Sequence, residues 1–180
     1  MELKLNILEK SVTELQIQVK DDDFSFRHFI YDPNENYLGT ISLISDKPQQ
    51  YGLVNSEGRT ILFSTKMKKF LGSQYFIKDK EGNTLGIVKK QGLGNKKFTM
   101  ENIFSIILLC RNKDKHLEIQ DSKNRKIAEL EVVKNEIHFK IRDEVFDRLL
   151  LLGFFLSIVH NKLGGRNISD GFNPEMAFSD

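Results

Sequence analysis

The strongest hydrophobic segment of the chain lies near its C-terminal end, between Val145 and Leu163. At helical spacing its apolar side chains leave no broad polar face, so a helix formed here must be enclosed on all sides. The unbroken apolar core, residues 149–159, is shorter than the roughly 20 residues that a bilayer span requires. The pattern therefore predicts a central core helix over about residues 144–163, with Asp143 as its N-cap.

Before this segment, most of the chain alternates between apolar and polar residues, which is the period of a β-strand. Residues 12–19 place Leu15, Ile17 and Val19 on one face and polar side chains on the other. Residues 96–110 fit a helix and a strand almost equally well, and their β-branched residues favour a strand. All runs together predict about twelve strands joined by short turns.

A hairpin motif recurs along this β region. Each copy consists of an apolar strand, an Asx residue, a polar turn and a second apolar strand. The Asx residues are Asp32, Asn55, Asp79 and Asp121. Gly58 and Gly82 stand three residues after their Asx, where Gly or Asn would supply a positive φ. Recurrence at turns predicts a structural role for Asp32, Asp79 and Asp121, not acid–base catalysis.

The absence of predicted helices on the faces of so large a sheet indicates closure, because open edges invite aggregation. A barrel of about twelve strands is wider than side chains alone can fill, and the apolar helix is the obvious filler. The sequence therefore predicts a mainly β fold: a closed antiparallel barrel enclosing one C-terminal hydrophobic α-helix. Residues 1–165 would form a single domain, followed by a C-terminal tail over residues 166–180.

The hairpin motifs and the helix together resemble a known family. The stretches that carry the resemblance are YFIKDKEGNTLGIV, LVNSEGRTILF, IQDSKNRKIAEL and DRLLLLGFFLSIVH. They are similar to the tubby C-terminal-like superfamily, which includes phospholipid scramblases and LURP-one-related proteins, over about residues 25–164. The resemblance implies a twelve-stranded barrel threaded by the helix. It also implies lipid-related functions, since tubby domains bind phosphoinositides through basic residues and scramblases are linked to lipid movement and calcium. The chain lacks the cysteine-rich cluster of scramblases.

Cysteine usage and the first residues bear on location. Cys110 is the one cysteine of the chain and lies in the apolar run IILLC, so we expect a small core residue. The first residues carry scattered charges and no hydrophobic region typical of a signal peptide. We therefore expect a cytoplasmic location, with peripheral attachment to a membrane as an option.

Basic residues are concentrated in one part of the chain. Residues 59–100 carry a net charge of +8, whereas the whole chain has +2. The candidate anion- or lipid-binding residues are Lys66, Lys68, Lys69, Lys89, Lys90, Lys96 and Lys97. On neighbouring hairpins these lysines would converge on one rim and attract anionic lipid. The alternative is that they cover solvated strand faces.

Catalytic and metal sites are not predicted. His28, His116, His138 and His160 are dispersed, without the spacing of metal ligands, so structural or surface roles are favoured. The acidic run 21–23 lacks the loop of a calcium site and reads as a solvated turn. We expect no catalytic residues, no cofactor and no metal, and hence not an enzyme.

The leading functional hypothesis is a non-catalytic module that binds anionic phospholipid headgroups at a membrane surface. A protein-interaction or structural module without a lipid role is the first alternative. A small-ligand carrier or an enzyme of unknown activity, using a cavity at the helix end near His160, is the second. Partners would be an anionic membrane surface or a protein, with no specific nucleic acid and no transmembrane span.

Overall fold

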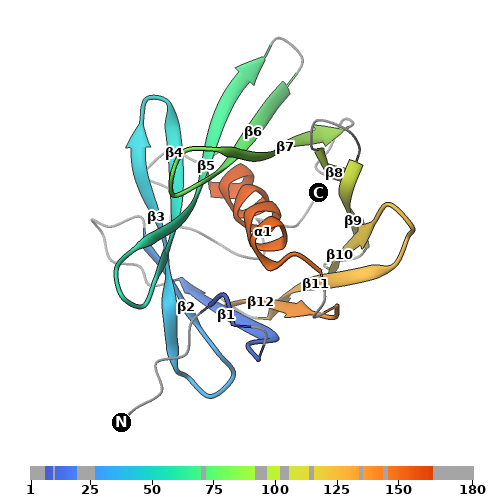
Figure 1. Ribbon diagram of the computed structural model, residues 1–180. Coiled ribbons are helices and arrows are strands. Elements are labelled where there is room, and N and C mark those ends of the chain that lie inside the picture. The colour runs from blue at the N-terminus through green and yellow to red at the C-terminus, as the bar shows by residue number, and fades with distance from the viewer. Residues whose placement is uncertain are drawn as a thin grey trace.

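A computed structural model describes residues 7–9, 11–19, 27–69, 72–91, 97–101, 106–113, 116–133, 136–143 and 146–163. In this part of the chain, twelve strands are followed by one helix (Figure 1). The strands are β1 (Glu14–Val19), β2 (Arg27–Tyr31), β3 (Tyr37–Asp46), β4 (Gln49–Asn55), β5 (Thr60–Lys69), β6 (Gly72–Asp79), β7 (Thr84–Gln91), β8 (Lys97–Glu101), β9 (Ile106–Lys113), β10 (His116–Asp121), β11 (Lys126–Val133) and β12 (Glu136–Ile141). The helix is α1 (Arg148–Leu163). The acidic run 21–23 and the tail 166–180 lie outside the described residues.

The strands form one closed antiparallel barrel. Each strand pairs with the next along the chain, and β1 closes the ring by pairing with β12. At the closing ladder Leu15 lies opposite Phe139 and Ile17 opposite Ile137. The wall therefore has no free edge. The predicted fold class is confirmed, and the ambiguous stretch 96–110 contributes to β8 and β9.

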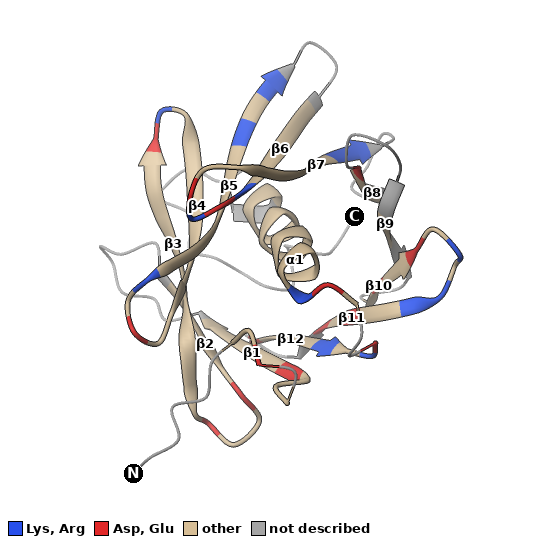
Figure 2. Ribbon diagram, in the orientation of Figure 1, with Lys and Arg blue, Asp and Glu red and all other residues tan. Residues whose placement is uncertain are grey.

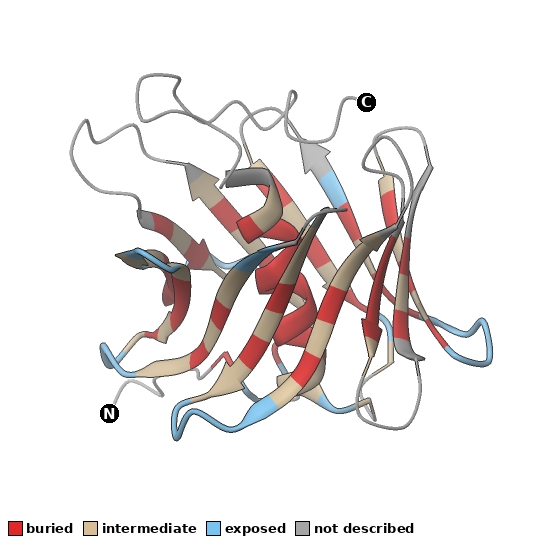
Figure 3. Ribbon diagram, turned by 90° about the horizontal axis from the view of Figure 1, so that it is seen from above, coloured by how far each residue is buried: buried red, intermediate tan, exposed pale blue. Residues whose placement is uncertain are grey.

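Alternating burial along the strands shows why this sequence closes around a core. In β12, Ile137, Phe139 and Ile141 are buried, whereas His138 and Lys140 are only partly covered. Figure 3 shows the same banding of buried and less buried residues along several strands. Successive side chains of a strand point to opposite faces, so the apolar series of each strand lines the barrel interior.

The recurrent hairpin motif forms Asx turns, as predicted. Asp32 Oδ1 accepts the backbone N–H groups of Asn34 at 2.9 Å and Asn36 at 2.8 Å. Equivalent bonds to the backbone are accepted by Asn55, Asp79 and Asp121. The third residue after each Asx has a positive φ: Glu35 64°, Gly58 78°, Gly82 88° and Asn124 60°. These side chains serve the turns.

The central helix is present, but it begins about one turn later than predicted. Asp147 Oδ1 accepts the backbone N–H of Leu150 at 3.1 Å, so Asp147 is the N-cap. The prediction of Asp143 was wrong because Asp143 instead accepts the N–H of Phe146 at 3.2 Å, just before the helix. Both aspartates precede the apolar run, and only the path of the chain distinguishes their roles.

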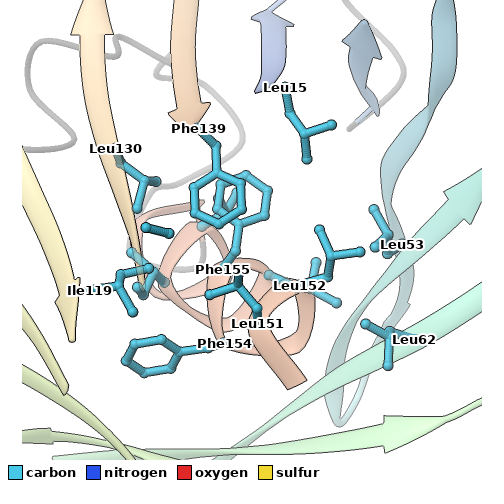
Figure 4. Packing of buried hydrophobic residues seen from close by; sticks show 14 of the residues in the cluster. Leu15, Leu53, Leu62, Ile119, Leu130, Phe139, Leu151, Leu152, Phe154 and Phe155 are labelled. Carbon is cyan, nitrogen blue, oxygen red and sulfur yellow. The ribbon is translucent and has the colours of Figure 1, made fainter. Parts of the chain in front are cut away.

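The helix fills the barrel. All ten residues from 151 to 160 are buried, and Phe155 stacks on Phe139 of β12 with ring centroids 4.5 Å apart (Figure 4). On another side Gly153 allows close approach to β6, because a Cβ at this position would lie 2.5 Å from Ile77 Cγ2. Cys110 is also buried, which confirms its prediction as a core residue.

Candidate functional site

The candidate lysines lie toward one end of the barrel. His160, in the last turn of α1, contacts Ser64 of β5, so the residues that follow Ser64 extend beyond the C-terminal end of the helix. Lys66, Lys68 and Lys69 follow on β5. Lys89 and Lys90 lie near the end of β7 at the same level, because Lys89 lies opposite Gln74 of β6, which lies opposite Met67 of β5. Figure 2 shows the basic ends of β5 and β7.

The remaining candidates are less fully described. Lys97 begins β8, opposite Gln91 of β7, and only its backbone is described. The same holds for Lys69 at the end of β5. Lys96 lies outside the described residues. The site is therefore built from Lys66, Lys68, Lys89 and Lys90.

Strand alternation divides these four lysines. Lys66 and Lys68 continue the series of Leu62 and Ser64, which faces the interior, and Lys90 continues the series of Val88. Burial lowers the pKa of Lys66, and the positive charges of Lys68 and Lys90 lower it further. The ammonium group of Lys66 is thus close enough to those of Lys68 and Lys90 to be repelled by both. We call Lys66, Lys68 and Lys90 the lysine cluster.

Lys89 belongs to the opposite face and has a partner. Its ammonium group forms an ion pair with Glu101 of β8. By contrast, no member of the lysine cluster forms an ion pair with any described residue. The negative end of the α1 dipole lies nearby and offsets part of their mutual repulsion. The lysine cluster is a partly exposed group of cations without a carboxylate counter-ion in the described chain.

A buried polar network lies beneath the lysine cluster. Ser64 Oγ and His160 Nδ1 are 2.9 Å apart, and both residues are fully buried. The His160 ring lies between two tyrosines, with ring centroids 4.7 Å from Tyr51 and 5.0 Å from Tyr75. The Tyr75 hydroxyl donates to Asn161 Oδ1 at 2.8 Å. The last turn of α1 is thus attached to β5 and β6 by hydrogen bonds.

The electrostatics of the network keep His160 neutral. Burial, together with the charge of Lys66, lowers the pKa of His160 to about 3. Burial raises the pKa of Tyr75, and burial together with the charge of Asp46 raises that of Tyr51 to about 12. All three rings are therefore uncharged at neutral pH, and the positive charge of this region resides on the lysines.

The Ser64–His160 pair is not arranged for nucleophilic catalysis. Ser64 has no exposed surface from which to attack a substrate. Within the described part of the chain, His160 Nε2 has no hydrogen-bond partner, so no carboxylate orients the ring as a catalytic triad requires. The pair positions the C-terminal end of α1 and places buried polar groups next to the lysine cluster.

Sequence reasoning had found His160 and the lysines but had not found Ser64, Tyr51, Tyr75 or Asn161. A signal was present in β5, whose interior series changes from Leu62 to Ser64 and then to lysines. A polar residue at a core position of an otherwise apolar series indicates a buried partner. The partner itself could not be read, because His160 lies 96 positions away along the chain.

The other histidines lie away from this network. His28 is buried, whereas His116 lies 3.4 Å from Glu129 and His138 lies 3.1 Å from Glu136. Among the described residues, no group of three or more His, Cys, Asp or Glu side chains is positioned to hold a metal ion. Within the same residues, no helix has the length and apolarity needed to cross a bilayer.

Comparisons with known proteins support the fold alone. No protein family matches the sequence, and neither does any curated protein. The fold is similar to the X-ray structure of the Arabidopsis thaliana protein AT5G01750, with a TM-score of 0.58 and 10% sequence identity. The similarity covers 86% of this chain and 98% of the plant protein. The fold of this chain is therefore similar to one determined by X-ray crystallography.

Proposed function

We propose that this protein is a non-catalytic binding module for anionic phospholipid headgroups. The observation that carries the proposal is the lysine cluster, in which Lys68 and Lys90 both repel Lys66 and no member forms an ion pair with a described residue. Clustered like charges destabilise the free protein, and an anion relieves that repulsion. Phosphate and carboxylate groups of lipids satisfy several ammonium donors at once.

We also propose membership of the tubby C-terminal-like superfamily. The Asx hairpins at shared offsets, the closed barrel and the buried axial helix support this assignment together. The proposal places the binding activity at the cytoplasmic surface of a membrane, where anionic lipids attract basic segments by about 1 kcal/mol per lysine.

The test compares vesicle binding by two variants of equal charge. The first replaces Lys66, Lys68 and Lys90 by Gln; the matched control replaces Lys123, Lys126 and Lys140 by Gln, which lie in the β10–β11 turn, β11 and β12. Three lost contacts of about 1 kcal/mol each predict roughly 100-fold weaker binding to phosphatidylserine-containing vesicles for the first variant. Binding should also weaken as salt is added.

The control isolates position from net charge. We expect the control variant to retain most of the binding of the wild-type protein, and neither variant to lose its thermal unfolding transition. Equal losses in both variants would mean that only net charge matters. Wild-type binding that does not distinguish phosphatidylserine from phosphatidylcholine vesicles would refute the proposal.

A further inference from the structure

The wall of the barrel has two electrically opposite halves. Strands β4 to β7 contain six lysines and one acidic residue, Asp79, which closes an Asx turn. Strands β10, β11, β12 and β1 contain six acidic residues and two lysines. The two groups of strands face each other across the ring (Figure 2). The molecule therefore has a cationic side and an anionic side.

The outer face of the anionic half is a conventional hydrated surface. Glu129 pairs with Lys126 and Arg142, and Lys140 pairs with Glu14 across the closing ladder. Alternating cross-strand charges of opposite sign cover this side and need no external partner.

The outer face of the cationic half carries apolar side chains instead. Phe63, Phe76 and Ile87 each lie between two interior residues of their strands, so their side chains belong to the outer face. Met67 of β5, at 47%, and Ile44 of β3, the strand that adjoins β4, at 46%, are the most exposed large hydrophobic residues of the described chain. We call Ile44, Phe63, Met67, Phe76 and Ile87 the outer patch.

Strand register makes the outer patch continuous. Phe76 lies directly opposite Ile87, and Phe63 lies opposite Gly52. Across the β5–β6 ladder Phe76 lies opposite Thr65, so Phe63 and Met67 are its diagonal neighbours. The Ile44 side chain covers Gly52, since a Cβ on Gly52 would lie 3.0 Å from Ile44 Cγ1. An apolar band thus crosses the wall from β3 to β7, although α1 already fills the interior and no core requires these residues. Contiguous exposed apolar surface of this kind marks an interaction site.

The outer patch meets the lysine cluster at one corner of the barrel. Met67 lies between Lys66 and Lys68 on β5, and the row that contains Met67 and Gln74 continues to Lys89 of β7. A partner of this corner must offer negative groups beside hydrocarbon, within the spacing of one or two residues. An anionic bilayer has this layered chemistry, with phosphates above acyl chains.

We infer that the barrel docks on an anionic bilayer by this corner, with Met67 and Ile44 inserted below the headgroups that the lysine cluster binds. This orientation rests on the proposed function and adds an apolar contribution to it. The outer wall of β4 to β7 then faces the membrane, and the anionic half faces water.

The test uses a double variant and a matched control. Met67→Ser with Ile44→Ser removes the two exposed side chains, and Leu8→Ser with Tyr37→Ser removes two comparably exposed ones, at 37% and 41%, from outside the patch. Losing two partly inserted side chains predicts at least about tenfold weaker partitioning onto phosphatidylserine-containing vesicles for the first variant. Its salt dependence should stay unchanged, because no charge is altered. The control should bind as the wild type does.

A direct readout of insertion accompanies the partitioning. An environment-sensitive fluorophore attached through Met67→Cys should shift to the blue on adding these vesicles, whereas the same label at Tyr37→Cys should not. Cys110 is fully buried and stays unlabelled.

The outcomes separate this inference from the proposed function. Salt-sensitive binding that depends on the lysine cluster, combined with unchanged partitioning of the Met67/Ile44 variant or no shift at position 67, would overturn the inference alone. No binding of the wild type to anionic vesicles would overturn both. A dimer in sedimentation that the Met67/Ile44 variant abolishes would assign the outer patch to a second copy and also overturn the inference.

Discussion

Gly153 offers a quantitative test of how tightly the helix fits the barrel. In an exposed helix, Gly→Ala stabilises by about 1 kcal/mol. Here the new Cβ would lie 2.5 Å from Ile77 Cγ2 and 3.6 Å from Ile77 Cβ. Ordinary carbon contacts are about 3.5–4.0 Å, so one side must move by roughly 1 Å. Ile77 is β-branched and fully buried, and cannot rotate away without a clash.

The two effects have opposite signs, and their sizes decide the outcome. Overpacking of this kind costs about 1–3 kcal/mol, and the displacement required favours the upper part of that range. After the gain in helix propensity, we expect Gly153→Ala to lower the free energy of unfolding by about 1–2 kcal/mol. Denaturant titration with linear extrapolation measures this change, and an unaltered m-value shows that the fold is retained.

Removing the obstructing methyl should reverse the sign. Ile77→Ala alone leaves a cavity and costs about 2–5 kcal/mol. In that background Gly153→Ala should stabilise by about 1 kcal/mol, because the methyl group now has space and the helix gains propensity. The coupling of about 2–3 kcal/mol is typical of residues in contact.

The control background is Ile137→Ala, on β12 at the opposite side of the ring from β6. There Gly153→Ala should remain destabilising by the same amount as in the wild type. Stabilisation in the wild-type background, or an equal effect in the Ile77→Ala background, would refute the contact between α1 and β6.

Two further predictions concern the hairpins. Gly39→Ala should prevent stable folding, because its Cβ would lie 2.1 Å from the Val54 carbonyl oxygen. Gly82→Ala has open space around its Cβ but a φ of 88°, and should lower the stability by only about 1 kcal/mol. Thermal denaturation distinguishes the two variants, and similar losses of stability would contradict the reasoning. The side-chain hydrogen bond from Asn83 lowers the pKa of Asp79 in the folded protein. The ionised carboxylate therefore stabilises the fold at pH values above the unfolded pKa, near 3.8. This stabilisation is lost as the pH falls through the lower pKa of the folded protein. Asp79→Asn should therefore be less stable than the wild type at neutral pH, with a difference that shrinks below about pH 4 in acid titrations of unfolding; a difference independent of pH would contradict the assignment.

The fold was readable from the sequence because its signals are local. Period-two burial in β12 and the Asx residues at fixed offsets each depend on a few neighbouring residues. The apolar run of α1 is equally local, and its need for enclosure implied closure of the sheet. The helix start was misplaced because Asp143 and Asp147 are both good caps, and the choice depends on where the chain leaves the barrel wall.

The candidate site was only partly readable because its decisive contacts are not local. The sequence identified the lysines as candidates but could not show which of them have ion-pair partners. The register of β7 against β8 brings Lys89 close to Glu101, so Lys89 is paired, whereas the lysine cluster forms no ion pair with a described residue. The Ser64–His160 pair joins β5 to the end of the helix, which no short-range pattern predicts. Local periodicity could assign residues to faces, but could not say which groups meet across the barrel.

The axial helix gives the outer apolar residues their significance. In a barrel whose outer face was covered by another part of the protein, the outward side chains of Phe63 and Phe76 would pack in a second hydrophobic core. Here Phe154, Phe155 and their neighbours saturate the interior, so outward apolar side chains add little to folding and expose hydrocarbon to water. They occur on the half of the wall that also lacks acidic side chains outside the turns, and not on the half covered by ion pairs. The outward apolar side chains and the lack of acidic side chains thus occur on the same strands. This coincidence is the reason for assigning both features to one binding partner.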